Sequence, residues 1–369
     1  MSSQANHLMP TVVVGMSGGV DSSVAAAILA GQGYPVIGVM LRLWSEPGAE
    51  DSNRCCTPDA MSIARRVCAK LDISFYAIDA QEVFYQEIVE FFLSEYKKGR
   101  TPNPCIRCNN LIRWGILLKV AGDMGAEYLA TGHYARIIKT ENGLFELYKG
   151  LDPEKDQSYV LSGLKQSQIS KTLLPLGELT KSQVREIAKQ LGLASAKRPE
   201  SQDLCFLGGG DYRDFLRRNT PDLEQPGRIM DQRGNILGDH NGLSNYTIGQ
   251  RKGLRIAYSE PLYVIRIDTA LNTLFVGTLS ELGSQIMYVG EMNWIPDRYP
   301  ATKFRSEVKI RYRSQLFPGM VEVIDPFRIR VIFDHPLRDI TPGQIACLFD
   351  NDRVLGSGVI LGSASEEVK

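Results

Sequence analysis

The turn at residues 17–23, SGGVDSS, follows a β-branched run at 11–16 and opens a helix-like segment at 21–32. Two glycines let the backbone approach a phosphate closely, and a helix N-terminus offers N–H groups and partial positive charge. The serine hydroxyls would add donors, and the Asp21 carboxylate would suit Mg²⁺ on a pyrophosphate. A simple Ser/Asp-capped turn is the alternative. The complete SGGxDS string at a strand end favours nucleotide binding.

The string is neither the P-loop type, since no Lys follows the glycines, nor GxGxxG. It resembles the pyrophosphatase loop (PP-loop) of the adenine-nucleotide α-hydrolase superfamily, whose members cleave ATP between the α and β phosphates and adenylate a substrate. Two other strand ends fit the same pocket. Residues 38–41 would support an adenine ring, and Gly132 in TGHY (131–134) would let ribose or the α-phosphate approach. His133 alone is more often a satisfied core or surface histidine, although its place at a strand end favours function.

Cys105 and Cys108 form a CxxC pair within TPNPCIRC at residues 101–108. The two prolines predict a loop, neither helix nor inner strand. The spacing suits a metal or a thiol/disulfide pair, but structural zinc is disfavoured because the chain has no second CxxC or CxxH. Arg100 and Arg107 are expected to lower the thiol pKa values and favour thiolate.

The other cysteines differ in their surroundings. Cys205 stands where the α/β pattern ends, so a loop there could fold back over the nucleotide site, although an isolated cysteine is more often core. Cys68 and Cys347 are predicted to be core, and Cys55-Cys56 a loop feature. Seven cysteines without a secretion signal indicate reduced thiols rather than a disulfide scaffold.

The elements that position these residues change character along the chain. Strands are predicted at 11–16, 34–44, 73–80 and 127–137, and helices at 21–32, 58–71 and 83–99. This alternation implies βαβ units on a parallel sheet, whose ligands bind at the carboxyl ends of the strands. A helix is expected at 211–219, and from about 280 short alternating strands suit an antiparallel barrel.

We therefore predict an α/β fold with three domains. Residues 1–207 would form a parallel-sheet, adenine-nucleotide α-hydrolase-like (PP-loop) domain that binds ATP. Residues 208–280 would form a small central domain and 281–369 a C-terminal antiparallel β-barrel, both contacting RNA.

Composition limits the function. The 369 residues are 43% hydrophobic, enough for two or three domains, and 42 Lys+Arg against 42 Asp+Glu argue against a general nucleic-acid coat protein. The N-terminus lacks a signal pattern and no run reaches about 18 apolar residues, so a cytoplasmic protein without a membrane partner is expected.

The charge is nevertheless uneven. Residues 97–119 hold six basic side chains and no acidic one, and Arg251, Lys252 and Arg255 form another cluster. In 303–313 the basic residues alternate with apolar ones, which predicts a strand with a basic outer face and an inner face that includes Tyr312. One such cluster is usually only a solvated face. Three beside a nucleotide site favour a polyanion held through its phosphates, with loops reading a splayed base.

Eight strings occur in one order across nearly the whole chain: SGGVDSS, GRTPNPCIRCN, ATGHYAR, KDQSYVL, SQDLCF, TIGQRKGL, VKIRYR and TPGQ. Together they resemble the tRNA-specific 2-thiouridylase family, which thiolates the wobble uridine of certain tRNAs. The resemblance implies that Cys108 is the catalytic nucleophile, that Cys205 carries sulfur as a persulfide, and that Asp21 takes part in catalysis. It implies ATP binding by Gly15, Met16, Ser17, Gly18, Gly19, Val20, Asp21, Ser22, Leu41 and Gly132. It implies contacts with tRNA or its target base by Asn103, Pro104, Cys105, His133, Lys155, Asp156, Gln157, Arg311, Tyr312 and Gln344.

The implied reaction uses ATP and Mg²⁺ to adenylate O2 of the uracil, followed by attack of the persulfide sulfur and formation of a Cys108–Cys205 disulfide. The sulfur donor would be a cysteine desulfurase or a sulfur-relay protein, and a monomer is expected.

One departure keeps a second route open. Many family members have Asp where this chain has Cys105. Cys105, Cys108 and Cys205 together could hold a 4Fe–4S cluster whose open iron binds sulfide. Another PP-loop adenylating ligase, or a non-catalytic RNA-binding or iron–sulfur protein, are more distant alternatives. An adenylating ligase would leave the CxxC pair unexplained, and a non-catalytic protein would leave the SGGVDS string unexplained.

Overall fold

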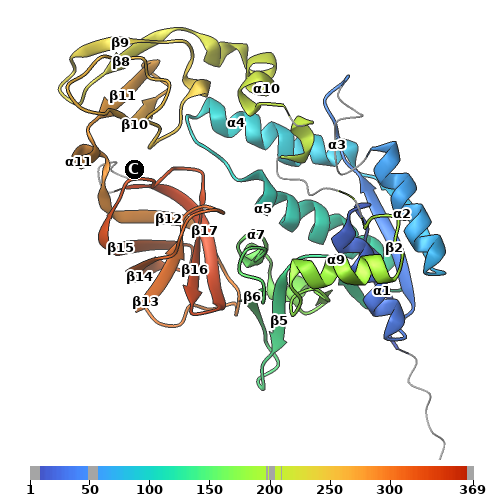
Figure 1. Cartoon of the computed structure of the whole chain (residues 1–369). Helices are drawn as coiled ribbons and strands as arrows, with labels where there is room; N and C mark the ends of the chain where they lie inside the picture. Colours follow the sequence, from blue (N-terminus) through green and yellow to red (C-terminus); the bar gives the residue numbers. More distant parts are fainter. Residues whose placement is uncertain (1–8, 49–56, 197, 199–203, 209, 364–369) are drawn as a thin grey trace, which may run out of the picture. The chain divides into compact units, whose positions relative to one another are not determined.

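The computed structural model describes residues 9–48, 57–196, 198, 204–208 and 210–363 (Figure 1). The chain divides into two compact units. The first unit is Met1–Tyr85 with Arg107–Gly209, and the second is Gln86–Ile106 with Gly210–Lys369. Within the described ranges, no helix is both long and apolar enough to cross a membrane.

A five-stranded parallel sheet forms the centre of the first unit, as the alternating pattern predicted. Its strands follow the order β3-β2-β1-β4-β7, and every neighbouring pair is parallel. The valines of β1 are fully buried because both faces of the sheet are covered. The strands are β1 (Val12–Gly15), β2 (Val36–Arg42), β3 (Ser74–Asp79), β4 (Tyr128–Ala130) and β7 (Thr172–Leu173).

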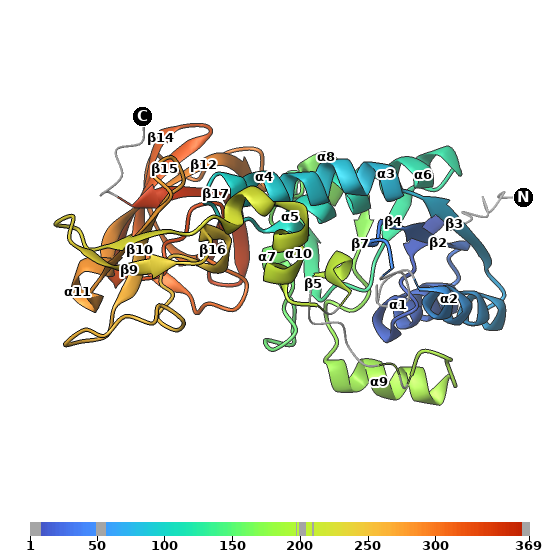
Figure 2. The same cartoon turned by 90° about the horizontal axis from the view of Figure 1, so that it is seen from above.

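Helices cover both faces of this sheet (Figure 2). Helices α1 (Val20–Gly31) and α2 (Pro58–Lys70) lie on one face, where Val24 and Val67 join the buried core. Helix α6 (Leu118–Asp123) lies on the other face and contacts β4, and α9 (Lys181–Gln190) packs against α1. Shorter elements are α7 (Ser158–Leu161), α8 (Gln166–Ile169) and the 3-10 turn η4 (Cys205–Leu207).

The single strand predicted at 127–137 is wrong, because the chain forms two strands there. β4 ends at Ala130, and β5 (Ala135–Lys139) pairs antiparallel with β6 (Phe145–Lys149). Residues 131–134 leave the parallel sheet between them. Apolar residues lie on both sides of this break, so the pattern does not reveal it.

The loop predicted around the CxxC pair is also wrong. Both cysteines lie on α5 (Pro104–Cys108), which continues as the π-helical segment η3 (Asn109–Leu117) and then α6. Pro104 occupies the first helical position, where its missing N–H costs nothing. Asn103 accepts a hydrogen bond at Oδ1 from the backbone N–H of Ile106 at 3.3 Å, as an N-cap side chain does.

The helix predicted at 83–99 is present with a π-helical middle, as α3 (Gln81–Phe84), η2 (Tyr85–Glu90) and α4 (Phe91–Lys97). In the second unit α4 meets α10 (Tyr212–Asn219), the helix expected at 211–219. Their rings pair as Phe92–Phe215, with centroids 6.3 Å apart, and Tyr96–Tyr212, with centroids 5.7 Å apart.

A four-stranded mixed sheet in order β10-β11-β8-β9 occupies the middle of the second unit. Only β8 and β11 run parallel. Its strands are β8 (Gly227–Met230), β9 (Ile236–His240), β10 (Tyr263–Asp268) and β11 (Thr273–Gly277), and short helical turns are η5 (Pro221–Glu224), η6 (Leu243–Asn245) and α11 (Leu279–Leu282).

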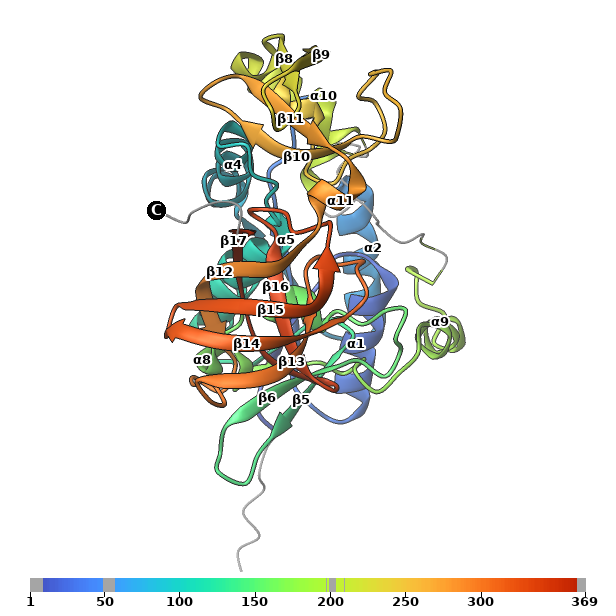
Figure 3. The same ribbon diagram turned by 90° about the vertical axis from the view of Figure 1, so that its left-hand side faces the viewer.

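The predicted antiparallel barrel is present from residue 284 (Figure 3). Six strands pair in order β12-β15-β14-β13-β16-β17, and pairing of β12 with β17 closes the ring. Val289, Val331 and Leu348 are among its buried core residues. The strands are β12 (Ser284–Trp294), β13 (Lys303–Lys309), β14 (Phe317–Asp325), β15 (Arg328–Leu337), β16 (Ile345–Asp350) and β17 (Arg353–Ser363).

Candidate functional site

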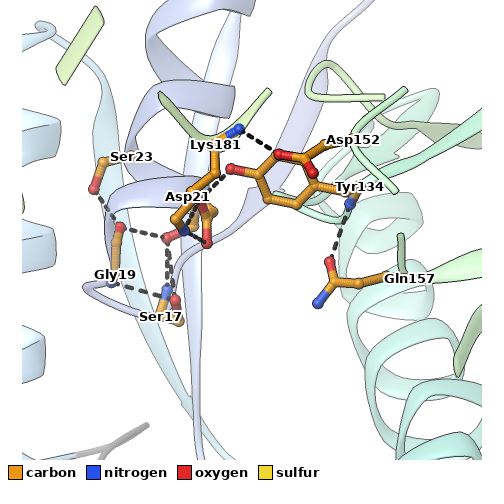
Figure 4. Close-up of polar contacts among 9 residues, drawn as sticks. Ser17, Gly19, Asp21, Ser23, Tyr134, Asp152, Gln157 and Lys181 are labelled. Atoms are coloured by element: carbon orange, nitrogen blue, oxygen red, sulfur yellow. Dashed lines mark hydrogen bonds and ion pairs between the residues drawn. The ribbon is translucent and has the colours of Figure 1, made fainter. Parts of the chain in front are cut away.

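The SGGVDSS turn joins β1 to α1 at the carboxyl end of the parallel sheet. Gly18 has φ +68°, a conformation that favours glycine. The Ser22 and Ser23 hydroxyls donate to the carbonyl of Gly19 at 3.2 and 2.8 Å, and the Ser17 hydroxyl accepts from Gly19 N–H at 3.3 Å (Figure 4). Gly19 begins α1 without a side-chain cap. The hydroxyls therefore shape the loop, and the first N–H groups of α1 are the donors suited to a phosphate.

Asp21 on this turn forms an ion pair that the sequence did not predict. Lys181 Nζ lies 2.7 Å from Oδ1 and 2.8 Å from Oδ2 of Asp21, and the Tyr134 hydroxyl donates to Oδ1 at 2.7 Å (Figure 4). Lys181 is buried, and its backbone N–H donates to Asp152 Oδ2 at 2.9 Å. A carboxylate is a ligand that Mg²⁺ prefers, so Asp21 fits that ion, provided the ion replaces the ammonium group.

Two residues expected to contact tRNA are joined to the same network. Gln157 N–H donates to the Tyr134 carbonyl at 2.8 Å, and its Oε1 accepts from Tyr134 N–H at 3.0 Å (Figure 4). Asp156 Oδ1 accepts from the N–H groups of Gly150 and Ser158 at 3.1 and 3.0 Å. These side chains hold residues 156–158 close to Tyr134, whose hydroxyl donates to Asp21. Lys155 lies in the same turn, where its N–H bonds the Asp152 carbonyl at 3.1 Å.

Gly132 packs against the start of α1. A Cβ there would lie 2.6 Å from the carbonyl carbon of Asp21 and 2.7 Å from the nitrogen of Ser22. The glycine therefore permits a close approach to the PP-loop itself, and its predicted contact with ATP stays a prediction.

His133 is buried, with both ring nitrogens bonded inside the protein. Nδ1 lies 2.8 Å from Thr131 Oγ1, and Nε2 lies 3.1 Å from Arg113 Nη1. Arginine only donates, so Nε2 accepts and Nδ1 carries the proton. Burial and the Arg113 charge hold the pKa of His133 well below its ordinary value. The imidazole is neutral, and its predicted tRNA contact stays a prediction.

The remaining predicted ATP residues lie at the ends of β1 and β2 and at the start of α1. Met16 and Leu41 are buried, with Met16 N–H bonded to the Val39 carbonyl at 2.8 Å. Val20 is buried at the start of α1, and a Cβ on Gly15 would lie 3.2 Å from Leu117 Cδ1.

The five described cysteines are all thiols outside disulfides. Cys108 is buried on α5, Cys105 is exposed on the same helix, and Cys205 is partly buried in η4. The neighbouring Phe206 packs on Phe84, with ring centroids 6.2 Å apart, and fixes η4 to the first unit.

Cys68 and Cys347 are core residues, as predicted, and burial raises the pKa of the Cys68 thiol to about 11. Cys55-Cys56 lie outside the described residues. Among the described residues, no group of three or more His, Cys, Asp or Glu side chains is arranged to hold a metal ion. The 4Fe–4S site stays a prediction.

The predicted strand with a basic outer face is present as β13 (Lys303–Lys309), where Lys303 and Arg305 are exposed and Val308 is buried. Its charges are paired: Lys303 lies 3.0 Å from Glu322, Arg305 lies 2.6 Å from Asp334, and Arg311 pairs with Asp339. Tyr312, expected on the inner face, is exposed because β13 ends at Lys309 and the alternation ends with it. Lys309 Nζ lies 5.8 Å from the centre of its ring.

Gln344, also expected to contact tRNA, lies in the turn before β16. Its side-chain amide bonds the backbone carbonyls of Thr101 and Pro102, immediately before Asn103.

A parallel α/β sheet with an SGGVDSS turn at its carboxyl edge defines the class of ATP-using PP-loop proteins. Three family profiles match the chain. Residues 10–209 match "tRNA methyl transferase HUP domain", 213–278 "tRNA methyl transferase PRC-barrel domain" and 284–360 "Aminomethyltransferase beta-barrel domain".

Curated relatives are similar over nearly the full length. The chain is 43% identical to the tRNA-specific 2-thiouridylase MnmA of Carboxydothermus hydrogenoformans, across 95% of this chain and 97% of the relative. It is 44% identical to the protein of that name from Chloroflexus aggregans, across 95% and 98%. A solved 4-thiouridine synthetase–RNA complex with bound ATP is less similar, at 17% identity, a TM-score of 0.35, and 58% and 51% coverage. The chain belongs to the tRNA-specific 2-thiouridylase family.

Proposed function

We propose that this protein is a tRNA 2-thiouridylase, which uses ATP to activate O2 of the wobble uridine and replaces that oxygen with sulfur. The observation that carries the proposal is the SGGVDSS turn, which opens α1 without a side-chain cap. The chain belongs to the 2-thiouridylase family, and its first unit also holds the thiols of Cys108 and Cys205.

The chain's own residues have separable roles in activation. The N–H groups at the start of α1 bind the phosphates of ATP. Asp21 would be the oxygen ligand for Mg²⁺, which would neutralise charge on the departing pyrophosphate. The Lys181 ammonium group, which contacts the Asp21 carboxylate, would then be available to a phosphate oxygen. The uracil O2 attacks the α-phosphate and pyrophosphate leaves, so C2 carries AMP as a good leaving group.

Sulfur transfer uses the two thiols. The terminal sulfur of a Cys205 persulfide attacks C2 and AMP departs, leaving a C2–S–S–Cys205 linkage. The Cys108 thiolate attacks the Cys205 sulfur, breaks the S–S bond and releases 2-thiouridine. A Cys108–Cys205 disulfide remains, and two electrons from an external thiol reductant restore both thiols.

A second route is favoured by one observation, the cysteine at position 105. Its thiol is exposed at the second residue of α5. If Cys105, Cys108 and Cys205 together held a 4Fe–4S cluster, no persulfide on Cys205 would be needed. Sulfur would come from a cysteine desulfurase or a relay protein in either route.

We also propose that the protein is a cytoplasmic monomer.

The test is nucleoside mass spectrometry of tRNA from cells that lack the protein and cells that regain it. We expect 2-thiouridine to disappear and return. With purified components, release of AMP and pyrophosphate should require both tRNA and a sulfur donor. A methylated nucleoside instead, as the family profile descriptions suggest, would contradict the proposal.

A further inference from the structure

The turn that precedes β16 holds the chain just ahead of α5 by reciprocal hydrogen bonds. Gln344 Nε2 donates to the carbonyls of Thr101 and Pro102 at 2.9 and 3.3 Å. In return, Thr101 N–H donates to the carbonyl of Pro342 at 3.0 Å. Gln344 and Thr101 are 243 positions apart in the sequence, and both belong to the second unit.

The close approach depends on Gly343. Its φ is +90°, and a Cβ there would lie 3.0 Å from Arg100 Cβ and 3.1 Å from the carbonyl carbon of Thr101. The turn itself is fixed to β17, because Gly343 N–H donates to the Ile360 carbonyl at 2.9 Å and Ile360 N–H donates to the Gln344 carbonyl at 2.8 Å. Gln344 therefore projects from a rigid edge of the barrel.

The other end of the held segment is anchored as well. Arg100 N–H donates to the carbonyl of Glu95 at 2.9 Å. The buried Glu95 carboxylate lies 2.7 Å from Lys98 Nζ and 3.6 Å from Arg100 Nη1. Residues 98–102 are thus fixed at both ends, and the next residue, Asn103, caps α5.

We propose that Gln344 is a positioning residue. It fixes residues 101–102, and through them the start of α5 with Asn103 and Cys105. Its amide nitrogen has two carbonyl partners in the segment. The inference rests on the proposed function, in which the start of α5 meets the target base.

The chain offers variants that separate the two roles. Gln344→Glu keeps the shape of the side chain but removes both donors and places a carboxylate against two carbonyls. Gly343→Ala leaves the amide intact and pushes the turn away from Thr101. Gln285→Glu is the matched control, because Gln285 Nε2 also donates to two carbonyls, those of Phe333 and Asp334 at 3.4 and 3.3 Å.

Hydrogen exchange of the full chain tests the positioning without requiring activity. Gln344→Glu and Gly343→Ala should both speed exchange at Thr101 and Ile106, whose N–H groups bond Pro342 and Asn103, while β12 and β17 stay protected. Gln285→Glu should leave Thr101 and Ile106 unchanged. Unaltered exchange in both variants would overturn the inference whatever reaction the protein catalyses.

Kinetics then separates positioning from contact. Both variants should lower kcat for thiolation at saturating tRNA by at least about tenfold, because misplacing reacting groups is costly, while the Kd for tRNA stays within about twofold. A Gln344→Glu protein with normal kcat and much weaker tRNA binding would assign Gln344 to tRNA contact and overturn the positioning role. If wild-type protein made no 2-thiouridine, the proposed function would fail while the exchange result stood.

Discussion

Lys181 Nζ contacts both carboxylate oxygens of Asp21, at 2.7 and 2.8 Å, across 160 positions of sequence. The pair connects α9 to the first turn of α1 and fixes the acidic residue of the PP-loop. The side chains are 11% and 33% exposed, so the interaction is screened less than a surface pair but more than a core one.

The Lys181–Asp21 pair predicts non-additive stability. Lys181→Met and Asp21→Asn should each destabilise the protein, because each leaves a partly buried charge without its partner. The double variant should be less destabilised than the sum, with a coupling of about 1–3 kcal/mol. Denaturant unfolding of the four proteins measures this. Tyr134→Phe, which removes one neutral donor to Asp21, is the control and should have a smaller effect. If the changes in unfolding free energy of the two single variants simply added up in the double variant, the Lys181–Asp21 contact would not hold the loop.

The close approach of Gly132 predicts weaker ATP binding in Gly132→Ala. The new methyl group would displace the start of α1 at Asp21 and Ser22, at a cost of about 1–3 kcal/mol for overpacking. Titration calorimetry with ATP is the measurement. Gly31→Ala, at the far end of the same helix, is the matched control, since a Cβ there meets nothing within 4 Å. If Gly132→Ala bound ATP as tightly as Gly31→Ala, the close packing of Gly132 on α1 would not matter for ATP binding.

The cysteines predict a separation of activation from sulfur transfer. Cys108→Ser and Cys205→Ser should each abolish 2-thiouridine formation while ATP binding survives, because neither residue belongs to the PP-loop. Mass spectrometry of the product tRNA measures 2-thiouridine formation, and titration with ATP measures nucleotide binding. Cys347→Ala, which changes a barrel core thiol, should keep thiolation. Normal thiolation in either serine variant would remove that cysteine from the mechanism.

Position 105 distinguishes the two sulfur routes. In the persulfide route Cys105→Asp, which restores the residue of many family members, should retain activity and the purified protein should contain no stoichiometric iron. In the cluster route the Cys105→Asp variant should lose activity. Iron and acid-labile sulfide analysis after anaerobic purification accompanies the assay. A stoichiometric cluster, with activity lost on its removal, would rule out the persulfide account.

His133 predicts a loss of stability in acid. Its pKa is held well below the ordinary 6.5 in the folded protein, so below pH 6.5 the unfolded chain binds a proton that the folded chain does not. Stability is unaffected above about pH 6.5 and falls as the pH drops below it, by up to about 1.4 kcal/mol per pH unit.

His133→Gln should make that slope shallower. A residual slope is expected, since burial also lowers the pKa of His240. NMR titration of the histidine rings gives the direct check, with the variant identifying the His133 signal. A His133 ring that titrates near pH 6.5 would contradict the buried, neutral assignment.

The parallel sheet and the barrel could be predicted from sequence because their signals are local. The β-branched run before SGGVDSS and the spacing of Ile63 and Val67 on α2 indicate strand and helix without knowledge of distant partners. The helical state of Cys105 does not follow from the two nearby prolines, which in most positions argue against a helix. Pro at the first helical position with Asn103 at the cap is a helix start.

Other features depend on contacts that no local pattern contains. Lys181 follows Thr180, whose capping box with Gln183 marks a helix start, but only the packing of α9 on α1 brings the Lys181 ammonium group to Asp21. The paired charges on β13 follow from strand order, which sets Glu322 opposite Lys303 and Asp334 within reach of Arg305. The break between β4 and β5 depends on the close contact of Gly132 with α1.

The carboxylates beside Lys303, Arg305 and Arg311 change what nucleic-acid binding on this face would involve. An RNA phosphate arriving there would exchange one fixed anion for another, so fewer mobile counterions would be released than the number of basic side chains suggests. Affinity at this face would then vary little with ionic strength. It would depend instead on whether the phosphates of a folded RNA match the positions of the Glu322, Asp334 and Asp339 carboxylates.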